Sequence, residues 1–264
     1  MSEMNRKLDL DDYKKISLDI LIDVAKFCEE NNITYFLACG TLLGAIRHKG
    51  FIPWDDDIDI MIPRNEYKRF LDIYKSDNYK LLKPSEGVFF YAKVYDTKTV
   101  VYEKMFDSNK VKPIGVSIDI FPLDGIVNDE KIVNKIVNKS NFYETLLRMS
   151  NQPLNYRNKL KNKIYRIITR IIGSKNLVKI IEKIDQTYPY ENSDYAIRIK
   201  TTPNGVNRAL PKSVYEIDKK EFEGHMFNVP KGYDIWLKSF FGENYMELPP
   251  EEKRVAHIRE GYFI

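Results

Sequence analysis

Apolar residues in the first quarter of the chain follow the spacing of amphipathic helices and short strands. Over 11–30 they recur at every third or fourth position, which predicts a helix with one apolar stripe. Residues 33–38 are mostly apolar and predict a buried strand, and Gly40 then turns the chain into a short helix over 41–48. Over 57–60 polar and apolar residues alternate, which is typical of a half-buried strand.

The rest of the chain continues with the same two patterns, and no repeat or flexible linker interrupts it. Strands are expected at 79–82, 89–95, 99–104, 116–121 and 195–200, and helices at 67–74, 129–150, 156–187 and 233–241. We therefore predict an α+β fold with a mixed sheet flanked by helices over 1–126. A helical and mixed C-terminal region over 127–264 is expected to pack on this core as part of one structural unit.

Composition places the chain among folded globular proteins. It has 264 residues, of which 43% are hydrophobic and 30% are charged, and no apolar run approaches the length of a membrane-spanning helix. Its polar start predicts no secretory signal. Cys28 and Cys39 form no Cys-x-x-Cys pair, which excludes a disulfide framework and a cysteine zinc site and favours a reducing cytoplasm. Because the three histidines are far apart, we expect any metal to be bound by oxygen.

Three aspartates carry the clearest chemical signal. Asp57 and Asp59 stand at alternate positions of the expected strand, so their carboxylates are predicted to share one face. Two such carboxylates repel unless a hard cation lies between them, which favours Mg²⁺ or Mn²⁺. Asp119 stands alone between isoleucines in the strand over 116–121 and is the candidate for a third ligand. The competing interpretations are a solvated Asp turn at 55–57 and a buried salt bridge at Asp119.

A second signal lies where the short helix begins. Unpaired N–H groups at a helix start suit a phosphate, and Gly40 followed by Thr41 allows a ligand to approach the main chain. The sequence after Gly40 lacks the pattern of an ATP-binding P-loop and that of a dinucleotide fold, so neither an ATPase nor a dehydrogenase is indicated.

Together these features resemble the nucleotidyltransferase fold, and longer blocks narrow the match. Residues 36–47 (FLACGTLLGAIR), 52–60 (IPWDDDIDI) and 118–125 (IDIFPLDG) resemble the LicD family of phosphocholine transferases, which are relatives of the fukutin-type enzymes. The tail, with YMELPP at 245–250 followed by Arg254 and His257, also resembles that family. The likeness is thinnest over 129–192. The interval between Gly40 and Asp57 is longer than in compact nucleotidyltransferases, so the phosphate loop is expected to be arranged differently.

The resemblance implies a metal-dependent transfer of phosphocholine, or a similar phospho-alcohol, from CDP-choline or a related CDP-alcohol. The acceptor would be a hydroxyl of a cell-surface glycan, teichoic-acid or capsule precursor, free or lipid-linked, and CMP would be released in the cytoplasm at the inner face of the membrane. In this interpretation Asp57 and Asp59 hold the metal at the diphosphate. Asp119 completes the metal site and accepts the proton of the acceptor hydroxyl.

Further residues are candidates for binding the substrates. Arg47 and Lys93 are expected to bind phosphate oxygens, with a charged helix end and an exposed lysine as the competing roles. Trp54 and Tyr91 are candidates for holding a quaternary ammonium group, although core packing is the commoner role of such aromatics. His257 is a candidate ligand for phosphate or acceptor, with a structural role as the alternative.

Charge is distributed unevenly along the chain. The formal net charge is +4, yet 152–184 contains nine Lys or Arg and one Glu, so this segment carries +8 and the remainder −4. Such a local basic surface argues against a general nucleic-acid coat. Isoleucines interleave with these cations, and the stripe that they form predicts either docking on an anionic bilayer or an ordinary helix packed on the core.

Two other functions stay open at this point. One is a nucleotidyltransferase that attacks an NTP with a small molecule or RNA as acceptor and releases pyrophosphate. The other is a non-catalytic glycan- or nucleotide-binding protein that retains the fold, against which the three aspartates weigh. The sequence does not separate CDP-choline from CDP-ribitol or CDP-glycerol, nor does it specify the acceptor sugar, the oligomeric state or the number of metal ions.

Overall fold

The computed structural model describes residues 6–154, 156, 160–198, 208–256 and 259–264. The helices of this part of the chain are α1 (Leu10–Glu30), α2 (Cys39–Arg47), α3 (Arg64–Ile73), α4 (Glu130–Ser150), α5 (Leu160–Ile172), α6 (Ser174–Asp185) and α7 (Tyr233–Phe241). The strands are β1 (Phe36–Leu37), β2 (Asp59–Pro63), β3 (Tyr79–Leu82), β4 (Ala92–Asp96), β5 (Thr99–Tyr102), β6 (Ser117–Ile126), β7 (Tyr195–Ile197), β8 (Leu210–Pro211), β9 (Ile217–Phe222), β10 (His225–Pro230) and β11 (Glu260–Phe263).

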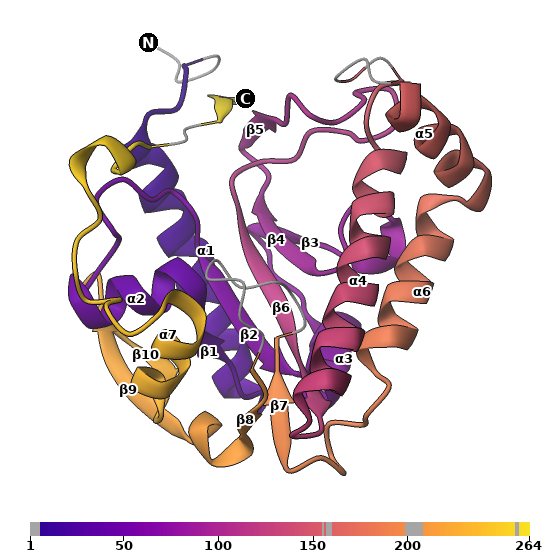
Figure 1. Ribbon diagram of the computed structural model, residues 1–264. Coiled ribbons are helices and arrows are strands. Elements are labelled where there is room, and N and C mark those ends of the chain that lie inside the picture. The colour runs from indigo at the N-terminus through magenta and orange to yellow at the C-terminus, as the bar shows by residue number, and fades with distance from the viewer. Residues whose placement is uncertain (1–5, 155, 157–159, 199–207, 257–258) are drawn as a thin grey trace.

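A mixed sheet occupies the centre of the molecule, with helices on both sides (Figure 1). Its strand order is β1-β2-β6-β4-β3, in which β2 and β6 are parallel and the other neighbours are antiparallel. The far half of β6 pairs with β7, which in turn pairs with β8. This mixed sheet with flanking helices confirms the predicted α+β fold.

Local sequence explains why the first helix forms where it does. The Asp9 carboxylate accepts a hydrogen bond from the Asp12 N–H, and the Asp12 carboxylate accepts one from the Asp9 N–H, so α1 begins with a capping box. Its apolar stripe packs against α3, where the Phe27 ring lies edge-on to Phe70 (6.0 Å) and Tyr74 (5.0 Å). The two helices therefore support the same part of the sheet.

The sheet buries one side of each central strand and leaves the other side accessible. In β6, Ile118 and Ile120 are fully buried, whereas the Asp119 side chain between them is 21% exposed. Alternation along the strand thus turns Asp119 away from the apolar core formed with α1 and α3.

The boundaries of several elements differ from the prediction. Strand β2 begins at Asp59, so Asp57 lies before it and the same-strand argument for Asp57 was wrong. The helix expected over 156–187 breaks at Gly173, whose φ of +83° is left-handed and cannot continue an α-helix. The hairpin of β9 and β10, which turns at Glu223 and Gly224, was not predicted because the residues of β9 alternate poorly between polar and apolar.

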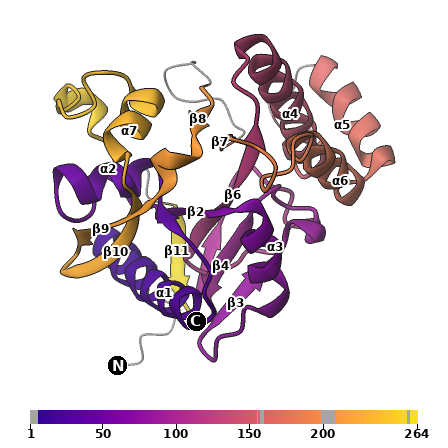
Figure 2. The ribbon, with the colours of Figure 1, turned by 90° about the horizontal axis from the view of Figure 1, so that it is seen from below.

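Strands from the C-terminal half of the chain pair with, or pack on, strands from the N-terminal half. Strand β7 extends the sheet from β6, β11 pairs with β5, and β10 packs beside β1. Helices α4, α5 and α6 gather on one side of the sheet, opposite α2 and α7 (Figure 2). A domain boundary at residue 126 stays a prediction. Within the described residues, no helix is both long enough and apolar enough to cross a bilayer.

Candidate active site

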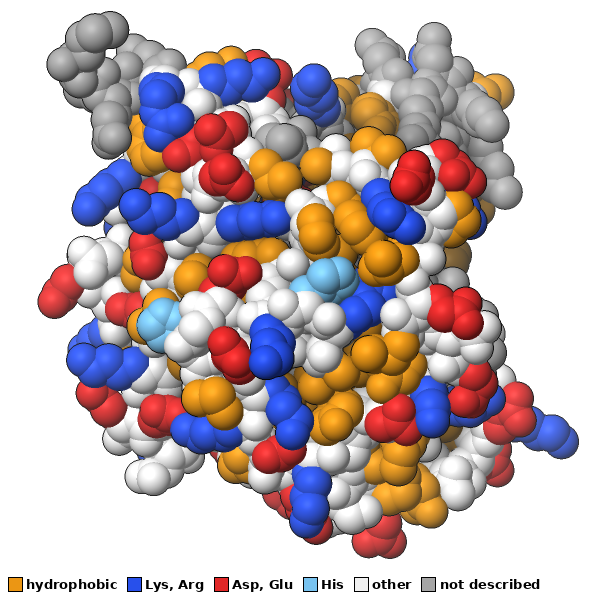
Figure 3. All heavy atoms as spheres, turned by 90° about the vertical axis from the view of Figure 1, so that its left-hand side faces the viewer, with side chains coloured by type: hydrophobic (Ala, Val, Ile, Leu, Met, Phe, Trp, Pro, Cys, Tyr) orange, Lys and Arg blue, Asp and Glu red, His pale blue; other side chains and the backbone are white. Residues whose placement is uncertain are grey.

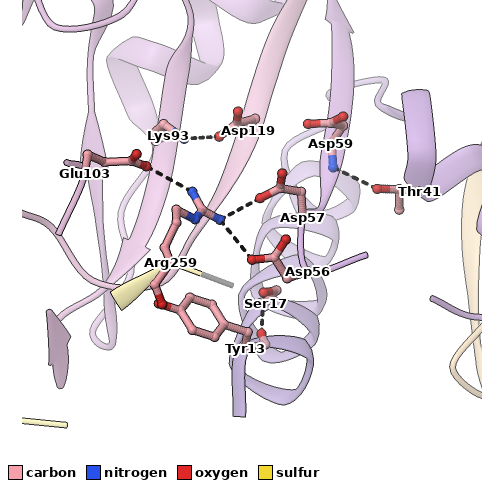
Figure 4. A network of polar contacts seen from close by, with 10 residues as sticks. All are labelled: Tyr13, Ser17, Thr41, Asp56, Asp57, Asp59, Lys93, Glu103, Asp119 and Arg259. Carbon is pink, nitrogen blue, oxygen red and sulfur yellow. Dashed lines mark hydrogen bonds and ion pairs between the residues drawn. The ribbon is translucent and has the colours of Figure 1, made fainter. Parts of the chain in front are cut away.

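Three charged side chains stand at the same level of three neighbouring strands. Asp59 of β2 is in register with Asp119 of β6, and Asp119 is in register with Lys93 of β4. The Lys93 ammonium forms an ion pair with the Asp119 carboxylate, and Lys93 itself is only 5% exposed. Figure 4 shows these groups beside Asp57 and Arg259 around one space. The strand pairing therefore gathers acids and cations on the accessible side of the sheet.

The start of α2 fixes Asp59 in place. The Asp59 N–H donates to the Thr41 hydroxyl oxygen (2.8 Å), and the Asp59 carbonyl accepts from the Ala38 N–H (2.9 Å). Thr41 is buried, and its hydroxyl joins the first turn of α2 to the first residue of β2. Burial raises the pKa of Asp59 to about 7, and the charges of Asp119 and Asp57 add to the effect. A carboxylate that is costly to ionise in this way favours a bound cation.

The acidic turn before β2 forms a second group of carboxylates. Asp55, Asp56 and Asp57 each offer an oxygen, and these oxygens lie within 4.8 Å of one another. Asp55 lies against Gly40, where an added Cβ would be 2.5 Å from the Asp55 Oδ2. Gly40 thus makes room for a carboxylate above the start of α2. Burial raises the pKa of Asp55 to about 6, with the charge of Asp57 as the next cause.

An arginine from the C-terminal segment neutralises this turn. The Arg259 guanidinium contacts Asp57 (2.6 Å), Glu103 (3.2 Å) and Asp56 (3.8 Å). Its backbone carbonyl accepts a hydrogen bond from the Tyr13 hydroxyl of α1 (3.2 Å). Burial lowers the pKa of Arg259, but these acids outweigh burial and raise it overall. Arg259 therefore joins the acidic turn to the loop after β5 (Figure 4).

A further cation reaches the site from β7. Arg198 follows this strand and is 9% exposed, with its guanidinium over the rings of Phe121 (4.8 Å) and Phe240 (5.0 Å). Its charge lowers the pKa of Asp59, although burial of Asp59 dominates. Arg198 therefore adds positive charge to the surroundings of Asp59.

A cavity of about 620 Å³ adjoins the charged groups. Lys93, Glu103 and Arg259 form part of its wall, so it opens beside the carboxylates. Three further lysines, Lys104, Lys110 and Lys112, also line it. The aromatic side chains of the lining are Tyr13, Phe89, Tyr95, Tyr102 and Phe106. The cavity thus combines an apolar, aromatic interior with a charged edge at the candidate site.

The structure places the other predicted residues as follows. Asp57 is 59% exposed and ion-paired with Arg259. Arg47 stands at the end of α2 remote from Thr41, where its guanidinium donates to the carbonyls of Tyr245 (2.9 Å) and Glu247 (3.0 Å). These two bonds give Arg47 a structural role, and its role as a phosphate ligand stays a prediction.

The two predicted aromatics are not part of the cavity wall. Trp54 is half-buried, and the Arg254 guanidinium lies over its ring at 5.7 Å. The Tyr91 ring packs on Phe121 (4.5 Å), and burial together with the charge of Asp119 raises its pKa. Tyr91 therefore reaches the carboxylates, whereas Trp54 packs beneath the tail. His257 lies outside the described residues.

Sequence reasoning missed Arg198, Arg259 and Glu103. Arg198 carried a weaker signal than Asp119: it stands between two isoleucines of the expected strand over 195–200, but Lys200 is a second charge in that strand. Arg259 carried no local signal, because it is 202 residues from Asp57 in the chain. The pairing of β11 with β5, together with the Tyr13 hydrogen bond to the Arg259 carbonyl, brings Arg259 and Glu103 to the acidic turn.

Comparison with known proteins agrees with this geometry. Residues 32–165 match the family model described as "LicD/FKTN/FKRP, nucleotidyltransferase domain". The lipopolysaccharide cholinephosphotransferase LicD of Haemophilus influenzae is 32% identical over 98% of this chain and the full length of that protein. Uncharacterized proteins of Rickettsia typhi (35% identical) and Rickettsia prowazekii (44%) match shorter parts, 29% and 23% of this chain and 26% and 23% of their own length. The matched family model and the full-length relative show that this chain belongs to the LicD family.

Proposed function

We propose that this protein transfers phosphocholine, or a similar phospho-alcohol, from a CDP-alcohol to a hydroxyl of a glycan and releases CMP. The observation that carries the proposal is the set of carboxylates on β2 and β6 with cations beside them. The relative from Haemophilus influenzae, named as a lipopolysaccharide cholinephosphotransferase, supports phosphocholine as the transferred group and a lipid-linked glycan as the acceptor. Teichoic-acid and capsule precursors also offer hydroxyl groups and are further candidate acceptors.

The acidic groups fit a divalent cation. Asp59 is a partly buried carboxylate whose pKa is raised by burial and by Asp119 and Asp57, so a hard cation would relieve their repulsion. We propose that Asp57, Asp59 and Asp119 hold Mg²⁺ or Mn²⁺. Such an ion, when bound, neutralises the diphosphate and stabilises the departing CMP.

The protein's own groups act on the phosphates and on the acceptor. Lys93, Arg198 and Arg259 supply positive charge where a diphosphate would lie between the acids and the cavity. Asp119 is the candidate acceptor of the hydroxyl proton, and its bond from Lys93 keeps the carboxylate oriented. Gly40 and Thr41 hold the backbone around Asp59 and Asp55.

The cavity provides a place for the alcohol part of the donor. A choline headgroup cannot donate a hydrogen bond, so it is held by aromatic faces and nearby acids. The wall contains five aromatic rings, and its Glu103 is ion-paired with Arg259, which also contacts Asp57. We propose that the headgroup enters this cavity while its phosphate stays at Lys93 and Arg259. The two free cysteines are buried and fit a reducing compartment, so the proposal places the reaction in the cytoplasm, at the inner face of the membrane.

Release of CMP tests the reaction directly. The purified protein is incubated with Mg²⁺, a glycolipid acceptor extract and, in turn, CDP-choline, CDP-ribitol, CDP-glycerol or an NTP. We expect CMP and a phosphocholine-labelled acceptor with CDP-choline, and neither product with the NTP. Pyrophosphate released from the NTP would contradict the proposal in favour of a nucleotidyltransferase. The acceptor preparation is first shown to be modified by a known family member. If this protein then forms no product from any donor, the result would favour a non-catalytic binding protein.

Metal binding is expected to depend on pH through Asp59. Its folded-state pKa of about 7 lies above the unfolded value of 3.8, so without metal the ionised group opposes folding, increasingly as pH rises between these two values. Mg²⁺ binds the ionised form, and we therefore expect the thermal stabilisation by Mg²⁺ to be larger near pH 8 than near pH 5.5. Differential scanning fluorimetry with and without EDTA measures it. An equal shift at both pH values, or none, would contradict the assignment.

A further inference from the structure

Helix α5 buries two polar side chains against the protein and presents five large apolar side chains to solvent. Arg166 and Thr169 are 1% and 0% exposed, and the Arg166 guanidinium donates to the Gln152 side-chain oxygen (3.1 Å). The large apolar side chains of the opposite face are 46% to 81% exposed: Leu160, Ile164, Ile167, Ile168 and Ile171. Their spacing places all five on one stripe. A surface helix in water has the reverse arrangement, so this face suits an apolar phase.

The positive charge of α5 and α6 indicates which apolar phase suits the exposed stripe. The sequence of α5 contains Lys and Arg but no acid, and Lys163 stands beside the apolar stripe. On α6, Lys175, Lys179 and Lys183 recur at every fourth position and are exposed. The segment 152–184 carries a net +8, whereas the rest of the chain carries −4. On the face shown in Figure 3, which lies away from α5, acidic and basic side chains are interspersed. Positive charge is therefore concentrated in the segment of the chain that contains the apolar stripe.

We propose that α5 docks on the surface of an anionic membrane. The isoleucine stripe would lie in the interface between headgroups and acyl chains, and Lys163 would reach the lipid phosphates, while the α6 lysines add to the attraction. A second copy of this chain fits the stripe poorly, because pairing would bring two segments of +8 together.

The docking helix is joined to the wall of the cavity. Arg170 of α5 forms an ion pair with Asp107 (3.2 Å), and the Lys110 ammonium donates to the Ser150 carbonyl at the end of α4 (3.1 Å). Asp107 and Lys110 belong to the loop after β5, which also supplies Glu103 and Phe106 to the cavity. A bilayer that binds α5 would thus hold this wall near lipid-linked molecules. Docking itself depends only on α5 and its charges, and it stands whatever the reaction.

Co-sedimentation with vesicles tests the inference on the full-length protein. One set of vesicles contains equal parts of phosphatidylglycerol and phosphatidylcholine, and the other contains phosphatidylcholine alone. We expect the wild-type protein to bind the anionic set and to bind the neutral set far more weakly. For the double variant Ile167→Gln/Ile171→Gln, we expect the partition coefficient onto anionic vesicles to fall at least about tenfold, because two exposed apolar side chains are removed.

Matched variants separate docking from general effects on the fold. Ile217→Gln/Ile235→Gln changes two isoleucines that are each 53% exposed on β9 and α7, and it is expected to bind like the wild type. Lys163→Glu keeps the stripe and is expected to weaken binding to anionic vesicles alone. Melting followed by circular dichroism identifies any variant that has lost its fold. The proposal is overturned if the wild-type protein binds neither set of vesicles, or if Lys163→Glu and Ile167→Gln/Ile171→Gln both bind as the wild type does. It is also overturned if the wild-type protein binds no vesicles and forms a dimer in size-exclusion chromatography that Ile167→Gln/Ile171→Gln does not form.

Discussion

Asp59→Asn is expected to lower the transfer rate by at least about 100- to 1,000-fold without destabilising the protein. The charges of Asp119 and Asp57 both act on this carboxylate, and an amide of the same shape cannot supply the negative charge that a cation needs. Because burial raises the pKa of Asp59 above its unfolded value, the amide also removes a group that opposes folding near pH 8. Rates of CMP release and the melting temperature without metal together measure both effects.

An exposed aspartate provides the control for this substitution. Asp72 lies on the outer side of α3, and Asp72→Asn is expected to leave both the rate and the melting temperature unchanged. Asp59→Asn with wild-type activity would refute the metal assignment. A slow Asp59→Asn variant that also melts well below the wild type would instead indicate a structural role for the carboxylate, which also forms a side-chain hydrogen bond with Cys39.

Arg64→Met is expected to lower the free energy of unfolding by about 3–5 kcal/mol. The Arg64 guanidinium makes two hydrogen bonds to Asp124, of 2.5 and 2.7 Å, and the two side chains are 7% and 2% exposed. Removal of the arginine leaves the carboxylate of Asp124 buried without its partner, in the neighbourhood of Asp185, whose pKa burial and Asp124 already raise. Urea unfolding followed by tryptophan fluorescence measures the loss.

The pH dependence of this loss identifies its cause. Burial raises the pKa of Asp124 above 3.8 even in the wild type, and Arg64 lowers it again in part. Without Arg64 the folded-state pKa would be higher still, so the variant loses more stability than the wild type as pH rises past 3.8. The difference from wild type is therefore expected to be smaller near pH 5 than near pH 8. Lys219→Met is the control, because its ion pair with Glu29 is half exposed on both sides and such pairs contribute little. A loss in Arg64→Met no larger than in this control would contradict the assigned role of the buried pair.

Local periodicity was sufficient to predict most of the regular structure. The helix over 11–30 and the short helix after Gly40 were confirmed, as were the strand at 79–82 and the helix over 233–241, because their apolar spacing is regular. The register of Asp59 beside Asp119 also agrees with the idea of a shared carboxylate site. The break at Gly173 was missed since an apolar stripe continues on both sides of it, and only the backbone conformation ends the helix.

The sequence indicated some residues of the candidate site and not others, and their roles stay predictions. An Asp-x-Asp pattern and a lone acid in an apolar strand indicated the acids, because a charge in such a place needs a partner. The partners came from elsewhere: Lys93 from β4, Arg198 after β7 and Arg259 before β11. Lys93 is 26 residues from Asp119 in the chain, and Arg259 is 202 residues from Asp57, so no local pattern relates these cations to the acids.

The sequence by itself determined most of the helices and strands, the acids and the basic segment, because each depends on residues that are neighbours in the chain. The tertiary structure alone decided which cation meets which acid, and it drew the C-terminal strand to β5. It also decided that α5 presents isoleucines outward and buries an arginine. The physical reason is that strand pairing and burial join distant segments, and the energy of a charge or an apolar side chain depends on what surrounds it in space.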